Sequence, residues 1–212
     1  MRQNLSLHTN LYPRVTPAGA YYAVFNNIDS PSRTLLCSLL KAKKKVPVNQ
    51  QQLLEWCKTT DADAALNLLY RLQKLEFLYG SPVPSDYGDT PLEKRLPEIL
   101  VQLSETGKAL LANDNGLYFA AAGFHHESAE EVAALAGEII RLSEQHALLI
   151  KNNLNINQNA WSICDPAGQS HLAFFPMYFG EYKFVLVIAG VPQLQNEAFV
   201  EMVELLYRRY GS

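Results

Sequence analysis

The sequence predicts an α+β protein with a helical N-terminal unit and a C-terminal unit that combines helices with five strands. Over residues 28–80, apolar residues recur at helical spacing behind recognisable helix starts. Beyond residue 92, the pattern changes to helix, two strands, helix, three strands, helix. The formal charge also changes sign, because residues 1–90 carry 10 Lys and Arg against 7 Asp and Glu, whereas residues 91–212 carry 8 against 14.

Composition and cysteine usage set the broad limits. With 212 residues, 48% of them hydrophobic, the chain has the composition of a protein that buries a core. Residues 1–20 lack the apolar stretch of a secretory signal, and no run approaches the roughly 18 apolar residues of a membrane span. We therefore expect a cytoplasmic protein. Cys37, Cys57 and Cys164 are widely spaced in apolar surroundings, which predicts buried free thiols rather than a disulfide or metal ligands.

The chain opens with a segment, residues 1–27, that mixes aromatic residues with proline and glycine. This composition predicts an irregular arm that ends by packing on the rest of the protein. Ser30 followed by Pro31 is an N-cap with a first-turn proline and predicts the first helix. Leucines at helical spacing continue this helix as far as the lysine cluster at residues 41–45.

Two further helix starts follow, each with the spacing of a capping box. Asn49 with Gln52 predicts the second helix, and Thr60 with Asp63 predicts the third. Apolar residues at helical spacing follow both starts, so we expect each helix to bury one face.

The order of these elements suggests a domain type. A short extended piece at residues 46–48 separates the first two helices, and a strand-like tail at residues 77–80 follows the third. This is the order of a winged-helix unit, so we predict a winged-helix-like domain over residues 28–80, with a generic three-helix bundle as the alternative. Residues 81–91 are rich in proline and polar residues and predict a linker or a reduced wing.

The first part of the C-terminal unit is a helix, a hairpin and a long helix. Apolar residues at helical spacing predict a helix over residues 92–103. Residues 110–123 are two apolar runs joined by Asp-Asn-Gly at residues 114–116, the residue types of a tight hairpin turn. Ser128 begins a capping box and predicts a long helix that continues to about residue 150.

Three more strands and a helix complete the unit. Apolar alternation at residues 161–163 predicts a strand, and Asp-Pro-Ala-Gly at residues 165–168 predicts the turn that returns the chain through residues 172–175. Residues 184–189 are apolar on both faces, as a central covered strand should be. Residues 195–210 predict an amphipathic helix.

This order of elements over residues 92–210 resembles the roadblock/dynein light chain family. The resemblance also rests on the Asn115-Gly116 turn, Gly123 after the second strand, the alanine-rich stretch 133–137 and the apolar strand before Gly190. It implies a roadblock-like five-stranded antiparallel sheet sandwiched by helices over residues 92–212, with the long helix on one face and the terminal helices on the other. It further implies a homodimer and an association with a small Ras-like GTPase or its assembly.

The long helix carries more apolar surface than one face of a sheet requires. Leucines at seven-residue intervals form a second stripe beside the first one. Coverage of this stripe by the N-terminal unit or by the preceding loops is one interpretation. The other, which the resemblance favours, is a dimer interface in which two long helices lie side by side across a two-fold axis. The predicted dimer-interface residues are Leu135, Ile139, Leu142 and Leu149.

Large apolar side chains gather around the expected connection at residues 174–182. Filling of the core accounts for about half of them. The others predict a partner interface, since aromatic residues and methionine dominate such surfaces. The predicted partner-interface residues are Met177, Tyr178 and Phe179, and we expect Tyr178 and Phe179, beside Gly180, to point outwards.

A winged helix also raises the question of DNA binding. The third helix begins with Asp61 and Asp63, which phosphates repel, rather than with the basic or amide residues that read bases. A solvated helix end explains most of the lysine cluster. The candidate nucleic-acid contacts are Lys43, Lys44, Lys45, Arg71 and Lys74.

The sequence offers no catalytic signature. His125-His126-Glu127 suggests zinc, but no Cys or His nearby in sequence completes a tetrahedral set, so a polar start to the helix is preferred. Nucleophile-elbow, zinc-protease and phosphate-loop motifs are absent from the sequence. We therefore expect no enzyme activity, no metal and no cofactor.

Together these observations predict a dimeric adaptor or regulator that binds other proteins. The resemblance implies a small Ras-like GTPase as the partner. The alternative is a DNA-binding transcription regulator that uses the winged helix on DNA and the C-terminal unit to dimerise. No membrane insertion is expected in either case.

Overall fold

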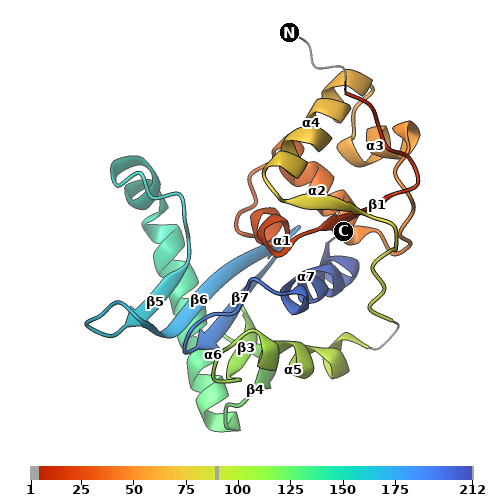
Figure 1. The fold of residues 1–212 in the computed structure, drawn as a ribbon. Coiled ribbons are helices and arrows are strands. Elements are labelled where there is room, and N and C mark those ends of the chain that lie inside the picture. The colour runs from red at the N-terminus through yellow and green to blue at the C-terminus, as the bar shows by residue number, and fades with distance from the viewer. Residues whose placement is uncertain (1–4, 89–90, 212) are drawn as a thin grey trace.

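The structure is a computed structural model that describes residues 5–88 and 91–211. Figure 1 shows the N-terminal helices stacked beside α7 and the sheet below them. The elements of the described ranges are β1 (Tyr12–Val15), α1 (Pro17–Val24), α2 (Pro31–Lys41), α3 (Gln50–Cys57), α4 (Ala62–Lys74), β2 (Leu78–Ser81), α5 (Leu92–Gln102), β3 (Ala109–Asn113), β4 (Tyr118–Ala122), α6 (His126–Gln145), the π-helical turn η1 (Leu149–Asn153), β5 (Trp161–Cys164), β6 (Ser170–Phe179), β7 (Tyr182–Ala189) and α7 (Glu197–Tyr210).

The predicted α+β class is confirmed, with N-terminal helices followed by an antiparallel sheet that packs against α5, α6 and α7. Among the described residues this sheet has five strands in the order β4-β3-β7-β6-β5. Leu111 pairs with Leu186, and Phe174 pairs with Val187, so β3 and β6 flank β7 on either side. β7 is therefore central, as its apolar residues predicted.

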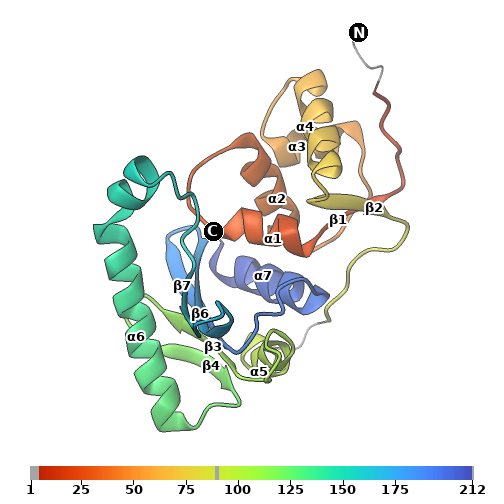
Figure 2. The same ribbon diagram turned by 60° about the vertical axis from the view of Figure 1, so that its left-hand side comes forward.

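Side chains alternate along the strands and form two apolar layers. On one face, Leu110, Phe174 and Val187 pack with Ala133 and Ala136 of α6. The opposite face packs against α5 and α7, and the same apolar cluster continues into the N-terminal helices. Figure 2 shows this order, with α6 on one side of the sheet and α7 between the sheet and α1.

The predicted hairpin is present and lies close to α6. Gly116 has a φ of +78°, which a residue with a side chain adopts only with strain. Asn113 supports the turn, because its Oδ1 accepts hydrogen bonds from the backbone N–H groups of Asn115 and Leu117 at 3.1 and 2.9 Å. A Cβ atom placed on Gly137 would lie 3.1 Å from the nitrogen of Gly116. The small residues of α6 therefore allow the turn to approach the helix.

The irregular arm predicted for residues 1–27 is wrong for most of the residues described. This segment contains β1 and α1, while residues 1–4 lie outside the described ranges. β1 pairs with β2 over four positions, from Tyr12 with Ser81 to Val15 with Leu78. The prolines do not prevent this, since Pro17 occupies the first turn of α1, where its missing N–H group is not needed.

The helix starts of the N-terminal unit follow the sequence closely. Ser30 and Asn49 are the N-caps of α2 and α3, and their side chains accept hydrogen bonds from the backbone N–H groups three residues later. The third start lies one residue beyond the predicted Thr60, because Asp61 caps α4 by accepting from the N–H group of Ala64 at 2.9 Å.

The sheet of this unit differs from the predicted order. Residues 46–48 form no strand and contribute one backbone hydrogen bond, from the N–H of Val48 to the carbonyl of Leu11, at 2.8 Å. The strand that pairs with β2 comes instead from before α1. The winged-helix assignment for residues 28–80 and the linker at 81–91, of which 89 and 90 are not described, remain predictions.

α7 connects the two units. Its residues Ala198–Tyr207 are all buried, because the sheet covers one side of the helix and α1 and α2 cover the other. The Tyr207 hydroxyl donates a hydrogen bond to the carbonyl of Ala23 at 3.0 Å. Lys45, which follows α2, forms an ion pair with Glu204 at 2.9 Å. The N-terminal helices therefore pack directly on the C-terminal helix.

Candidate functional site

The outer face of α6 exposes part of the predicted dimer interface. Leu135 and Leu142 are 37% and 43% exposed, and their seven-residue separation places them on one side of the helix. Leu149 is 46% exposed but lies in η1. Ile139 is half-buried and packs against the core between α6 and the sheet. The structure thus places three of the four predicted residues at the surface and directs the fourth inwards.

The long helix that is predicted to continue to about residue 150 is interrupted before that point. α6 ends at Gln145, a turn at His146 interrupts it, and residues 147 and 148 are helical again before the chain enters η1, in which the N–H of Leu154 donates to the carbonyl of Leu149 at 3.0 Å. Asparagine is a poor helix former, and Asn155, with a φ of +53°, turns the chain away. Such π turns often occur at functional sites.

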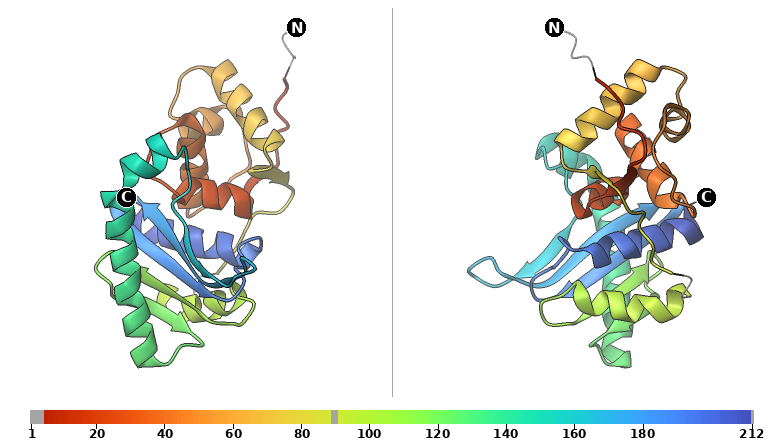
Figure 3. Two further views of the ribbon diagram at one scale, coloured as in Figure 1. Left: turned by 90° about the vertical axis from the view of Figure 1, so that its left-hand side faces the viewer. Right: turned by 45° about the vertical axis from the view of Figure 1, so that its right-hand side comes forward.

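β5 is an edge strand next to α6. Among the described strands, it pairs with β6 alone, so its outer edge offers unpaired backbone groups. Ile163 is 54% exposed, and the β5–β6 hairpin reaches out from the rest of the protein (Figure 3). Trp161 ties the strand to the helix, since its Nε1 donates to Ser143 Oγ at 2.5 Å.

The cysteine prediction is corrected at one position. Cys57 is buried and Cys37 is half-buried, and the thiols of the described chain are free. Cys164, by contrast, is exposed, because it ends the edge strand β5, where no further strand covers it.

The predicted partner-interface residues lie in strand β6 rather than in a loop. Met177 and Phe179 are fully buried, and the Phe179 ring lies 4.8 Å from the ring of Tyr207. The expectation that Phe179 points outwards is therefore wrong, because β6 extends to this residue and strand alternation directs it towards α7. Tyr178 lies on the opposite face, where it is half-buried.

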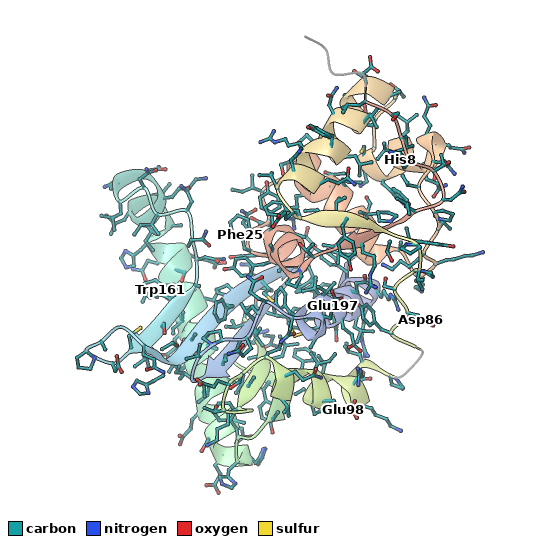
Figure 4. All side chains as sticks on the ribbon, in the orientation of Figure 1. His8, Phe25, Asp86, Glu98, Trp161 and Glu197 are labelled. Atoms are coloured by element: carbon teal, nitrogen blue, oxygen red, sulfur yellow. The ribbon has the colours of Figure 1, made fainter. Side chains whose placement is uncertain are left out.

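An apolar groove lies beside the end of α6. We call it the α6 groove, and its volume is about 550 Å³. It is formed by the segment after α1, the end of α6 with η1, the loop before β5, and β6. Phe25 and Trp161, labelled in Figure 4, come from different units and line its walls. The residues that characterise the groove are Phe25, Ile28, Ala147, Ile150, Trp161 and Tyr178.

Asn159 forms a polar end of the α6 groove. Its Nδ2 donates to the carbonyl of Phe25 at 2.6 Å, which links the loop before β5 to the N-terminal unit. Its Oδ1 is buried without a hydrogen-bond partner among the described residues. The phenol of Tyr178 lies beside this amide, and burial raises the pKa of Tyr178, so the hydroxyl keeps its proton.

The candidate nucleic-acid contacts do not share one environment. Lys43 and Lys44 are exposed after α2, and Arg71 and Lys74 are exposed in the last turn of α4. The prediction that Lys45 contacts nucleic acid is corrected, because its side chain is only 12% exposed and pairs with the buried Glu204. Two acidic residues lie at the start of α4, Asp61 as its N-cap and Asp63 in its first turn.

His125 and His126 lie at the start of α6, as its N-cap and its first residue. The hydroxyl of Tyr118 and Nδ1 of His126 share a hydrogen bond of 2.7 Å. In the described ranges, no group of three or more His, Cys, Asp and Glu side chains is placed to hold a metal ion.

Comparisons of the chain with protein-family models, with curated proteins and with solved structures gave no match. None of the helices in the described part of the chain has the length and apolar character needed to cross a membrane.

Proposed function

We propose that this protein is a non-enzymatic adaptor that dimerises through α6 and β5 and binds other proteins. The observation that carries the proposal is the exposed leucine pair on the outer face of α6, next to an unpaired sheet edge. A helix face and a strand edge that lie side by side suit a symmetric contact with a second copy.

The apolar surface is sufficient to contribute to such a contact. Burial of a whole leucine side chain stabilises by about 2 kcal/mol. Leu135 and Leu142 are 37% and 43% exposed. Their burial in both copies would therefore contribute roughly 3 kcal/mol, to which pairing of β5 with its symmetry mate would add. Ile163, exposed on β5, lies at the same edge.

Two features support a roadblock-like assignment for residues 92–212. The long helix α6 covers one face of the antiparallel sheet, and α5 and α7 cover the other, as the resemblance implies. The N-terminal helices occupy the outer side of α7, which leaves α6 and the sheet edges as the surfaces for partners.

On this basis we propose a small Ras-like GTPase, or its assembly, as the partner. An adaptor of this kind biases a GTPase by binding one nucleotide state more tightly, and the shift is limited to the difference between the two affinities. A pull-down with the cognate GTPase loaded with GTP or with GDP tests this. We expect capture that depends on the nucleotide, and capture in neither state would contradict the proposal.

The oligomeric state is tested by Leu142→Asp, with Val101→Asp as the matched control. Val101 is also apolar and 50% exposed but lies on α5, on the other face of the sheet. By light scattering we expect a dimer of twice the 23.8-kDa protomer for the unmodified protein and for Val101→Asp, and a monomer for Leu142→Asp. A monomeric unmodified protein, or a dimeric Leu142→Asp, would show that the interface lies elsewhere.

DNA binding is less well supported than protein binding. The start of α4 presents Asp61 and Asp63, and Lys45 forms an ion pair with Glu204. A gel shift at low and high salt separates the two proposals. Sequence-dependent binding that falls steeply with salt would favour the transcription regulator.

A further inference from the structure

We infer that two copies of the chain dock antiparallel along α6, with Leu142 of each copy facing the partner's Leu142 on the two-fold axis. This inference rests on the dimer proposed above and goes beyond it, because it fixes the direction and the register of the helix pair. The exposed residues on the outer side of α6 are arranged about Leu142 in a pattern that an antiparallel pair makes complementary.

The helical path of α6 continues through the turn at His146. The N–H of His146 donates to the carbonyl of Leu142 at 3.1 Å, and the N–H of Ile150 donates to the carbonyl of His146 at 3.0 Å. Both hydrogen bonds span four residues, as in an α-helix. Leu135, Leu142 and Leu149, which are 37%, 43% and 46% exposed, therefore follow one another at two-turn intervals along one helical path.

The exposed leucines are symmetric about Leu142. Leu135 lies seven residues before it and Leu149 lies seven residues after it, about 10 Å away in each direction. In an antiparallel pair centred on Leu142, Leu135 of each copy meets the partner's Leu149. All the exposed leucines of this stripe are then covered by leucines of the other copy.

The charges beside the leucines select the antiparallel direction. Glu138 lies four residues before Leu142 and His146 lies four residues after it, and both are exposed. An antiparallel pair places each Glu138 beside the partner's His146, whereas a parallel pair places it beside the partner's Glu138. Glu131 also lies on the N-terminal side of Leu142, while no Asp or Glu occurs between residues 144 and 165. A parallel pair would therefore bring two acidic helix halves together, which like-charge repulsion disfavours.

The sheet edge lies at the same level as Leu142. Trp161, the first residue of β5, donates from Nε1 to Oγ of Ser143 at 2.5 Å, and Ser143 adjoins Leu142 in α6. An antiparallel β5 of the partner would satisfy the edge groups that are unpaired among the described residues. The helix pair and the strand pair thus require one and the same two-fold axis.

Cross-linking at single cysteines tests the register. The background is Cys164→Ser, which removes the exposed native thiol, and the probe is a bismaleimide with a two-carbon spacer, to which two thiols add without an oxidant. In a preparation that light scattering shows to be dimeric, we expect Leu142→Cys to give a covalent dimer on a denaturing gel. Leu135→Cys should not, because its two copies lie about 21 Å apart, but a mixture of Leu135→Cys and Leu149→Cys chains should. Cross-linking of Leu135→Cys alone, or none of Leu142→Cys, would overturn the inference.

An exchange of charge tests the direction independently, by sedimentation over a dilution series. Glu138→Lys should weaken the dimer about fivefold, since it replaces two attractive contacts with the partner's His146 by unfavourable ones. His146→Glu should weaken it by a similar factor, and the double variant should regain the affinity of the unmodified protein. Glu105→Lys makes the same charge change on an exposed residue before β3 and should leave the affinity unchanged. No recovery in the double variant would contradict the antiparallel direction.

Failure of the dimer and failure of its register give different results. An unmodified protein that stays monomeric at every concentration would contradict the dimer itself, and with it this arrangement. A dimer that Leu142→Asp dissociates but that Leu142→Cys does not cross-link would keep α6 as the interface and overturn its register.

Discussion

Replacement of Lys45 by methionine is expected to destabilise the protein, because this lysine neutralises a carboxylate buried between the two units. Its Nζ lies 2.9 Å from Oε1 of Glu204 and donates to the carbonyl of Leu39 at 2.9 Å. The side chains of Lys45 and Glu204 are only 12% and 4% exposed. Arg208 is the second basic partner of Glu204, at 3.3 Å.

The size of the effect follows from what remains after the substitution. Removing one partner from a buried ion pair typically destabilises by about 3–5 kcal/mol. Arg208 continues to face Glu204, so we expect about 2–3 kcal/mol for Lys45→Met. For a chain of 212 residues this corresponds to a melting temperature lower by about 4–12 °C.

The pH dependence provides an independent check. Burial raises the pKa of Glu204 above 4.5 in spite of its basic neighbours, so the folded state favours the protonated form. Loss of Lys45 raises this pKa further. Protonation of Glu204 then removes its unpaired charge. The free energy of unfolding of Lys45→Met therefore rises as the pH falls. We therefore expect the penalty of Lys45→Met to be smaller at pH 5 than at pH 7.5.

Urea unfolding followed by circular dichroism measures the effect, with Lys43→Met as the control. Lys43 is exposed, so its replacement should change the free energy of unfolding by less than about 0.5 kcal/mol. Equal stabilities for the two variants would show that Lys45 is solvated and that the ion pair does not hold the N-terminal helices on α7.

Three further outcomes are expected. Gly19→Ala should destabilise the protein by about 3 kcal/mol or more, since the added Cβ would lie 2.0 Å from the carbonyl oxygen of Phe77. A urea midpoint close to that of the unmodified protein would contradict this packing. A disulfide reagent should modify the exposed Cys164 first and the buried Cys57 far more slowly, and Cys164→Ser should abolish the fast phase. Burial raises the pKa of Cys57 to about 11 and also raises the pKa of Tyr207. The folded state therefore retains protons that the unfolded chain loses, and the urea midpoint should decrease as the pH is raised from about 9 to about 11.

The elements predicted correctly are those with local signals. Ser30 and Asn49 cap their helices within three residues, and the Asn115-Gly116 turn joins two adjacent strands. The central position of β7 follows from its own apolar residues. Each of these depends on a few neighbouring residues, so the sequence pattern is sufficient.

The elements that were missed depend on distant partners. β1 is a strand because it pairs with β2, more than sixty residues later, and no local pattern announces this pairing. The outward prediction for Phe179 is wrong because β6 extends to this residue, beyond the predicted strand at residues 172–175. In both cases tertiary pairing decided a conformation that the local pattern left open.

The candidate sites divide in the same way. The exposed leucines of α6 could be found from their spacing within one helix. The α6 groove could not, since Phe25, Asn159 and Tyr178 come from three separate parts of the chain. The asparagine-rich loop at residues 152–159 was the signal in the sequence, although its polar composition alone indicates only a loop.

The enclosure of α7 has a consequence for how the protein forms during synthesis. This helix follows all the other described elements along the chain, yet it fills the space between the sheet and the N-terminal helices. During synthesis, the apolar surfaces of the sheet and of the N-terminal helices therefore stay exposed to water until α7 emerges from the ribosome. Nascent chains stalled before residue 197 are therefore the species on which chaperones should act.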